Sequence, residues 1–157
     1  MRRDEGFTLI ELLIVIAIIG VIAGAGTPTY LGIRARISLE NQAEEIVSDL
    51  RWTMSRSAAQ EGDSQWGVRF DNPSSGDDSY DVWRGESYAS GTVVTHVDLH
   101  GSVEFSDPST GSATDIIFSK ATGLPTASSS VSLYSLVGGA TGTIEVNTQG
   151  RIDLTLN

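Results

Sequence analysis

The sequence predicts an α+β protein in which a long N-terminal helix packs on a small antiparallel β domain. An apolar run from Phe7 to Ala25 passes into an amphipathic segment that ends near Glu61. Period-two alternation of apolar and polar residues follows in the rest of the chain. With 157 residues and 39% hydrophobic composition, the chain has room for one membrane segment and one compact domain.

Residues 7–27 are predicted to form the membrane-spanning half of the helix. The run from Phe7 to Ala25 contains one ionisable side chain, Glu11, and spans roughly 28 Å at about 1.5 Å per residue, close to the thickness of a bilayer core. Arg2 and Arg3 precede the run, so the positive-inside rule places the N-terminus in the cytoplasm and the chain after Thr27 on the far side. Removal as a secretory signal peptide is the alternative, but the run exceeds the usual length of about 7 to 15 residues.

Glu11 stands out inside this run because a carboxylate near the centre of a membrane helix costs about 2.5 to 3.5 kcal/mol. It lies four residues after Phe7, so a freed terminal amine at Phe7 is within one helical turn. The alternative is that Glu11 extends to the membrane interface without a partner.

The residues from Gly6 to Gly20, GFTLIELLIVIAIIG, closely resemble the prepilin signature of type IV pilins and type II secretion pseudopilins. The resemblance implies a pilin-like fold, a leader of residues 1–6, cleavage between Gly6 and Phe7 by a prepilin peptidase, and N-methylation of Phe7. It also implies that Glu11 pairs with the terminal amine of an adjacent subunit. Asp4 and Glu5 depart from the basic or small residues usual beside the cut.

Pro28 follows Gly20, Gly24 and Gly26 at the end of the apolar run. Proline lacks an amide hydrogen and clashes with the carbonyl four residues earlier, so we expect a kink or local melting between Gly24 and Pro28. The pilin resemblance implies that this element takes part in assembly. The small residues also suit close packing of membrane helices.

Residues 28–61 are predicted to form the amphipathic half of the helix. Apolar side chains recur there at three- and four-residue steps, with charged residues between them. The apolar positions are Ile33, Ile37, Ala43, Ile46, Val47, Leu50, Met54 and Ala58. Gly62 is the predicted stop.

Residues 63–157 are predicted to form the β-rich domain, with two small antiparallel sheets against the helix. The predicted strands centre on residues 66–70, 79–83, 92–99, 116–118, 131–137, 143–146 and 152–156.

Three parts of this domain resemble the GspH/FimT branch of minor pseudopilins and minor pilins. They are LRWTMSRSAAQ at residues 50–60, IIF at residues 116–118 ahead of Gly123, and IEVNTQGRI at residues 144–152. Some members of that branch bind DNA through basic residues, but residues 151–157 here hold one Arg against one Asp. The formal charge of −10 also disfavours nucleic acid.

The sequence contains no recognised catalytic or cofactor motif, so we expect a non-enzyme without cofactors or a metal site. His96, Asp98 and His100 would share one face of a strand and could meet a metal, but a polar strand face is the favoured interpretation. Acidic residues Asp71, Asp77, Asp78 and Asp81 offer oxygen ligands to calcium without the spacing of a calcium-binding hand; a solvated loop is favoured.

We therefore predict a minor pilin or pseudopilin, a structural subunit of a type II secretion pseudopilus or a type IV pilus. Its expected partners are the prepilin peptidase, other pilin or pseudopilin subunits and inner-membrane lipid. Its expected location is the inner membrane as a single-pass protein, then a periplasmic or extracellular filament. The alternative is a membrane-anchored or filament-tip binding module that recognises an exported protein substrate or a surface through loops between Asp71 and Ser90.

Overall fold

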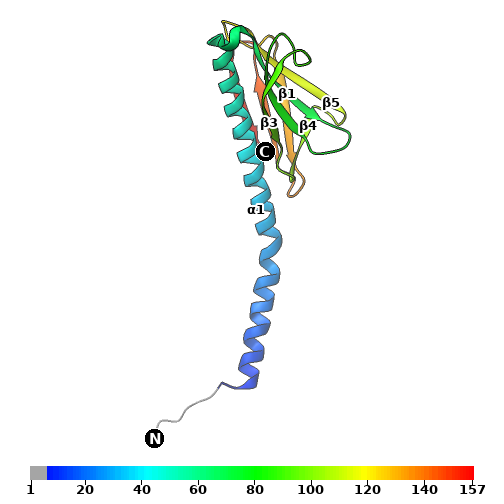
Figure 1. Ribbon diagram of the computed structural model, residues 1–157. Coiled ribbons are helices and arrows are strands. Elements are labelled where there is room, and N and C mark those ends of the chain that lie inside the picture. Colours follow the sequence, from blue (N-terminus) through cyan, green and yellow to red (C-terminus); the bar gives the residue numbers. More distant parts are fainter. Residues whose placement is uncertain (1–6) are drawn as a thin grey trace.

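One long helix, α1 (Leu9–Ala58), carries a β-rich head on its second half, while its first half extends away from the head (Figure 1). In this computed structural model the described residues are 7–157, without the side chains of residues 25–31. The arrangement confirms the predicted α+β class. A short 3-10 helix, η1 (Glu61–Asp63), leads from α1 to the strands. These are β1 (Trp66–Asn72), β2 (Ser79–Arg84), β3 (Thr92–Asp98), β4 (Val103–Asp107), β5 (Ser112–Phe118), β6 (Ser129–Ser135), β7 (Thr141–Val146) and β8 (Ile152–Leu156).

The strands form two antiparallel sheets, as the alternating pattern predicts. One sheet has the order β3-β2-β1-β5, and the other has the order β4-β6-β7-β8. Val68 in the centre of the first sheet pairs with Val82 on one side and Ile116 on the other. Edge strand β4 is absent from the sequence prediction, although its Val103 and Phe105 are buried.

The core lies where the inner face of α1 meets both sheets. Leu39, Ala43, Ile46 and Leu50 recur at three- and four-residue steps and are all buried. Each large apolar side chain removed from water contributes about 1.5 to 3 kcal/mol to stability. The apolar side chains that the sheets supply to this core are Trp66, Val68, Phe70, Tyr80, Val82, Val103, Phe105, Ile116, Phe118, Val131, Leu133, Ile144, Val146 and Ile152.

The helix continues through Pro28 without a break, so the local melting predicted between Gly24 and Pro28 is not seen. A proline removes one backbone hydrogen bond, and the bonds of the flanking turns remain to hold the helix. Among the described residues, whose side chains stop at Gly24 and resume at Gly32, no helix has both the length and the hydropathy needed to cross a membrane.

The predicted end of the helix at Glu61 is wrong by three residues, because α1 ends at Ala58. Gln60 already has a positive φ of 55°, and Gly62 lies in the turn of η1 with a φ of 69°. The Ser57 carbonyl accepts hydrogen bonds from the amides of Gln60 and Ala121. The Ala121 amide, from a distant segment, thus binds the Ser57 carbonyl, which would accept from the next turn if α1 were longer.

Candidate functional site

The first turn of α1 is closed by a reciprocal contact between Thr8 and Glu11. The Thr8 hydroxyl oxygen accepts from the Glu11 amide at 3.3 Å, and the Glu11 carboxylate accepts from the Thr8 amide at 2.9 Å and from its hydroxyl at 2.8 Å. The spacing Thr-x-x-Glu signals such a capping box, and it is absent from the predictions made from the sequence. The Glu11 carboxylate is therefore held against Thr8, the residue directly after Phe7.

The large apolar side chains from Phe7 through the first turns of α1 are all exposed. Phe7 is 86% exposed and Ile22 is 68% exposed. Those between them are Leu9, Ile10, Leu12, Leu13, Ile14, Val15, Ile16, Ile18, Ile19 and Val21. A continuous apolar surface of this extent is a hallmark of contact with lipid or another protein. Of the other predicted site residues, Gly6 lies outside the described residues, and Pro28 lies in α1 with its side chain outside the description.

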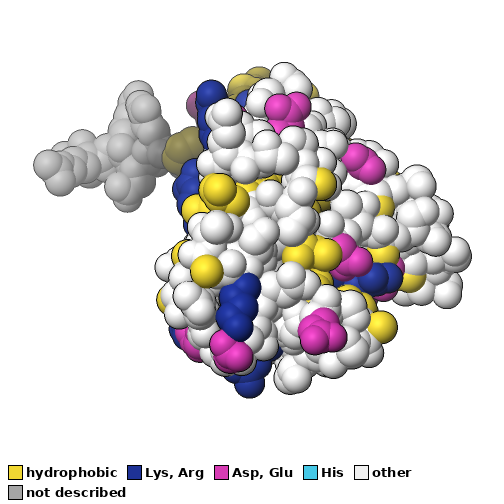
Figure 2. Space-filling view, turned by 90° about the horizontal axis from the view of Figure 1, so that it is seen from above, with side chains coloured by type: hydrophobic (Ala, Val, Ile, Leu, Met, Phe, Trp, Pro, Cys, Tyr) yellow, Lys and Arg dark blue, Asp and Glu magenta, His cyan; other side chains and the backbone are white. Residues whose placement is uncertain are grey.

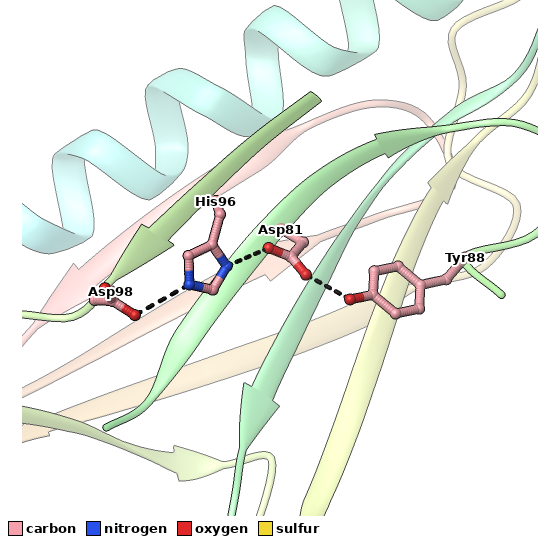
Figure 3. A network of polar contacts seen from close by, with 4 residues as sticks. All are labelled: Asp81, Tyr88, His96 and Asp98. Carbon is pink, nitrogen blue, oxygen red and sulfur yellow. Dashed lines mark hydrogen bonds and ion pairs between the residues drawn. The ribbon is translucent and has the colours of Figure 1, made fainter. Parts of the chain in front are cut away.

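A polar network occupies the outer side of the first sheet, where β3 and β2 lie side by side (Figure 3). His96 on β3 contacts two carboxylates, through Nδ1 to Asp81 at 2.5 Å and through Nε2 to Asp98 at 3.1 Å. The Tyr88 hydroxyl donates to the second oxygen of Asp81 at 2.5 Å. Antiparallel register explains the central contact, since His96 pairs directly with Asp81.

A neighbouring cation extends this network across the sheet. The Arg69 guanidinium lies 4.5 Å from the centre of the Tyr88 ring and forms an ion pair with Asp115 at 3.2 Å. The hydrogen bond between His96 and Asp81 is the main cause that raises the pKa of His96 above its ordinary value. The separate hydrogen bond from Tyr88 to Asp81 is the main cause that raises the pKa of Tyr88 to about 12. His96 is accordingly inclined to carry a positive charge between two carboxylates.

The network contains no serine or cysteine nucleophile among the four residues drawn in Figure 3. Asp81 is occupied on both oxygens, and the polar contacts link residues of β2, β3 and the following loop. Such contacts brace a sheet face.

His100 does not join His96 and Asp98, although the three alternate in sequence. Its Nδ1 contacts the Ser102 hydroxyl at 2.8 Å, and its amide donates to the Gln42 side chain at 3.1 Å. β3 ends at Asp98, so the strand geometry that would align the three side chains stops short of His100. Within the described side chains, no group of three or more His, Cys, Asp or Glu residues is arranged to hold a metal ion.

The acidic residues between Asp71 and Asp81 also serve separate purposes. Asp78 is buried and accepts from the Phe105 amide at 2.6 Å, and burial is the main cause that raises its pKa. Asp81 belongs to the network around His96, while Asp71 and Asp77 are exposed. Two of the four carboxylates are thus committed to contacts within the head.

The three segments that resemble the GspH/FimT branch meet at the end of the head farthest from Phe7. The Ser57 hydroxyl donates to the Phe118 carbonyl at 2.8 Å. A Cβ built on Gly123, which has a φ of 65°, would lie 2.7 Å from the Met54 carbonyl oxygen. A Cβ on Gly150 would lie 3.4 Å from the Met54 sulfur. The patterned apolar and glycine positions therefore form one packed corner.

An exposed strand edge lies near this corner. Strand β3 is the edge of its sheet, and its Val93 and Val94 are 45% and 44% exposed. A groove of about 310 Å³ runs beside it. The groove is lined by Trp52, Arg56, Glu61, Trp66, Arg84, Thr92, Val93 and Val94. A free edge with aromatic and aliphatic neighbours is the kind of surface on which an extended peptide adds a strand.

Basic and acidic side chains are intermixed on the face of the head seen from above (Figure 2). The ion pairs of the head include Arg69 with Asp115 and Arg151 with Asp153. Binding to a phosphate backbone needs clustered cations, because it draws on the release of counterions from successive phosphates. This face does not provide such a cluster.

Comparison with known proteins identifies the N-terminal segment. Residues 1–27 match the family described as the prokaryotic N-terminal methylation motif. Two curated relatives, both named "Fimbrial protein" and both from Pseudomonas aeruginosa, are 44% identical to the chain over 62 residues. The matched region covers 40% of this chain and 39% of the length of each relative. No solved structure matches the chain.

Proposed function

We propose that this chain, a type IV pilin-like protein by its N-terminal methylation motif and its similarity to fimbrial proteins, is a filament subunit matured by prepilin peptidase. The pilin-like relationship indicates a structural role. Assembly with other pilin subunits follows from that relationship as well. The observation that supports the proposal most is the exposed apolar surface from Phe7 to Ile22, which falls within the matched motif.

Maturation is proposed to cut the chain between Gly6 and Phe7 and to methylate the new terminal amine of Phe7. The motif match over residues 1–27 supports this position. The Thr8–Glu11 capping box adds a physical reason, because it holds the Glu11 carboxylate beside the residue that would carry the amine. An ammonium group there is attracted to the carboxylate of its own or of an adjacent subunit.

Assembly is proposed to use Glu11 and Pro28. Glu11 would pair with the terminal amine of the neighbouring subunit and so set its position along the filament. Pro28 weakens α1 at one point, since its ring removes a backbone donor, and residues 24–28 are thereby the part of the helix easiest to unwind as subunits pack.

The proposed location before assembly is the inner membrane, with residues 7–27 as a single span and the N-terminus in the cytoplasm. The head then lies on the periplasmic side and later on the filament surface. Lipid, prepilin peptidase and other pilin or pseudopilin subunits are the proposed partners.

Within the pilins, we favour a minor pilin or pseudopilin of a type II secretion pseudopilus or a type IV pilus. The packed corner of Ser57, Phe118, Gly123 and Gly150 supports this choice, because it unites the segments that resemble the GspH/FimT branch.

Replacement Glu11→Gln tests the assembly role. Glutamine retains a carbonyl that can accept from Thr8, so the helix start and membrane insertion should persist while the negative charge is lost. Incorporation into sheared filaments should fall about tenfold, since hydrogen bonds to charged groups contribute about 1.5 to 3 kcal/mol.

The control is Glu40→Gln, which removes a half-buried carboxylate that forms an i,i+4 ion pair with Arg36. Membrane content and filament content are measured separately for both variants. Filament incorporation of Glu11→Gln at the level of the control would overturn the role of Glu11.

A binding module is the second candidate, supported by the exposed β3 edge and the groove beside Trp52. An exported protein segment that pairs with β3 is the proposed ligand. The replacement Val94→Pro should abolish ligand capture, since proline cannot donate to a strand ladder, and should leave filament incorporation intact. Loss of incorporation instead would assign this edge to the filament.

A further inference from the structure

A pocket of about 330 Å³ lies at the base of the head, where the head meets the exposed part of α1. It is lined by Arg34, Ala35, Ser38, His100, Ser102 and Val137, which we call the base pocket. Its lining combines a guanidinium, two hydroxyls and an imidazole with two aliphatic groups. The Ser102 hydroxyl contacts His100 Nδ1, so the groups that suit a phosphate with an apolar attachment are the Arg34 guanidinium, the Ser38 hydroxyl and His100 Nε2.

The walls of the base pocket are tied together by backbone contacts. The Leu136 amide donates to the Ser102 carbonyl at 2.9 Å, which joins the β6–β7 turn to the segment after β3. The Ser135 hydroxyl donates to the Val137 carbonyl at 2.8 Å. His100 is fixed by Gln42 and Ser102. The pocket is therefore formed in advance, which lowers the entropy cost of binding.

The β6–β7 turn reaches the helix at Gly32, and it lies at the lower end of the head in Figure 1. A Cβ built on Gly138 would lie 3.5 Å from the Gly32 Cα atom, so the turn and Gly32 are at the same level along α1. Leu136 and Val137 in this turn are 51% and 44% exposed. The turn thus presents two aliphatic side chains beside the base pocket.

The distance along α1 sets the height of this turn above the membrane. From Leu9, where α1 begins, to Gly32 the helix rises roughly 35 Å at about 1.5 Å per residue. A bilayer core is about 30 Å thick, and about 40 to 45 Å with its headgroups. If Phe7 lies at the cytoplasmic edge of the core, the base pocket falls at the level of the headgroups on the other side.

Charge along the chain favours the same surface. Between Glu11 and Glu40 the only charged residues are Arg34 and Arg36, in a chain with twenty acidic and ten basic residues. The acidic residues Glu44, Glu45 and Asp49 lie farther along α1. The charge next to the apolar segment is therefore positive, while the protein as a whole is negative. This distribution is complementary to anionic lipid and repels it elsewhere.

We propose that the base pocket binds the headgroup of an anionic phospholipid, with Leu136 and Val137 resting against the membrane surface. The inference rests on the proposed anchoring of α1 in the membrane. In this arrangement the head rests on the bilayer surface in a fixed orientation before assembly, with Arg34 nearest the lipid phosphate. Extraction of the subunit into a filament then requires this contact to break.

The test uses the full chain, which contains no cysteine. An environment-sensitive fluorophore is attached in the variant Leu136→Cys and, as a control position, in Ala89→Cys, which lies in the exposed β2–β3 loop. Each protein is reconstituted into vesicles of phosphatidylcholine and into vesicles that also contain phosphatidylglycerol. Flotation of the vesicles reports anchoring, and emission reports contact of the head with lipid.

The expected result is a blue-shifted emission from position 136 in vesicles with phosphatidylglycerol only, with no shift from position 89. Adding Arg34→Gln should weaken this response about fivefold, which corresponds to about 1 kcal/mol per basic residue near an anionic surface. The matched control Arg151→Gln removes an exposed cation that pairs with Asp153 and should leave the response unchanged. High salt should also weaken it.

Three results would overturn the inference. If the chain floats with both kinds of vesicle but the emission from position 136 is not blue-shifted in either, the chain is anchored and its head does not bind the lipid headgroup. If the emission from position 136 is equally blue-shifted in both kinds of vesicle, and the shift grows with the amount of protein per vesicle, the turn contacts other copies of the chain. If the chain floats with neither kind of vesicle, both the binding of the lipid headgroup and the proposed membrane anchoring are wrong.

Discussion

The Ser57 hydroxyl donates a 2.8 Å hydrogen bond to the Phe118 carbonyl and so fastens the last turn of α1 to the end of β5. Ser57 is fully buried, and the two residues are far apart in sequence. The helix through which the subunit is proposed to assemble is therefore joined to the head by a buried hydrogen bond as well as by its apolar face.

Loss of this contact should destabilise the head. In Ser57→Ala the buried Phe118 carbonyl loses the Ser57 donor, and the free energy of unfolding should fall by about 1 to 3 kcal/mol. Chemical denaturation of the full chain in detergent measures the change. The exposed replacement Ser90→Ala is the control, and equal stability of the two variants would show that the contact is unimportant.

Gly123 should tolerate no side chain. Its φ of 65° is strained for other residues, and the Cβ of Gly123→Ala would lie 2.7 Å from the Met54 carbonyl and 2.8 Å from the Ala58 Cβ. We expect a loss of about 2 kcal/mol or more, because overpacking adds to backbone strain. Thermal unfolding measures it against Gly101→Ala, which meets nothing within 4 Å. A melting temperature equal to the control would disprove the close packing.

Asn72 should be the main polar link between the two sheets. Its buried side-chain amide donates at 2.9 Å to the carbonyls of both Phe105 and Pro108. The variant Asn72→Ala leaves both carbonyls without this donor and should cost about 2 to 3 kcal/mol. Asn41→Ala, on the exposed face of α1, should change stability by less than about 0.5 kcal/mol. Hydrogen exchange of β4 amides would reveal whether the loss is local to this strand.

His96 should make the stability of the head depend on pH. Its folded pKa is raised above 6.5 by Asp81 first and then by Asp98, so its stabilising effect is complete below 6.5. That contribution is lost as pH rises through the raised folded pKa. Asp81 also accepts from the Tyr88 hydroxyl, and the Arg69 guanidinium lies over the Tyr88 ring.

Nuclear magnetic resonance titration of the imidazole measures the folded pKa of His96. Unfolding measured at a series of pH values should give a decline in the wild type above pH 6.5 that is reduced in His96→Gln. A folded pKa at or below 6.5 would contradict the proposed network. Asp98→Asn provides a graded comparison, because it removes the weaker of the two carboxylate contacts.

Apolar periodicity was sufficient to predict the helix, both sheets and most strands. It missed β4 because Val103 and Phe105 provide only two alternating apolar positions among polar and glycine residues. The end of α1 depends on the contact between Ala121 and the Ser57 carbonyl, which no local pattern encodes. The end of α1 therefore follows from a tertiary contact, which patterns along the sequence do not predict.

The candidate site was predictable in unequal measure. The apolar segment with Glu11 is visible in the sequence, and the capping partner Thr8 could have been found from its spacing. The alternation of His96, Asp98 and His100 suggested a shared face, but the strand ends at Asp98. The pairing of His96 with Asp81 and the position of Tyr88 depend on strand register and loop path, which sequence patterns specify weakly.

The central claim is that the chain is matured at a prepilin site, and intact mass with N-terminal sequencing tests it most directly. The chain is recovered from cells with and without an active prepilin peptidase. Our account predicts a mature chain that begins at methylated Phe7 only when the peptidase is active. Persistence of residues 1–6 with an active peptidase, or a cut near Gly26, would contradict it.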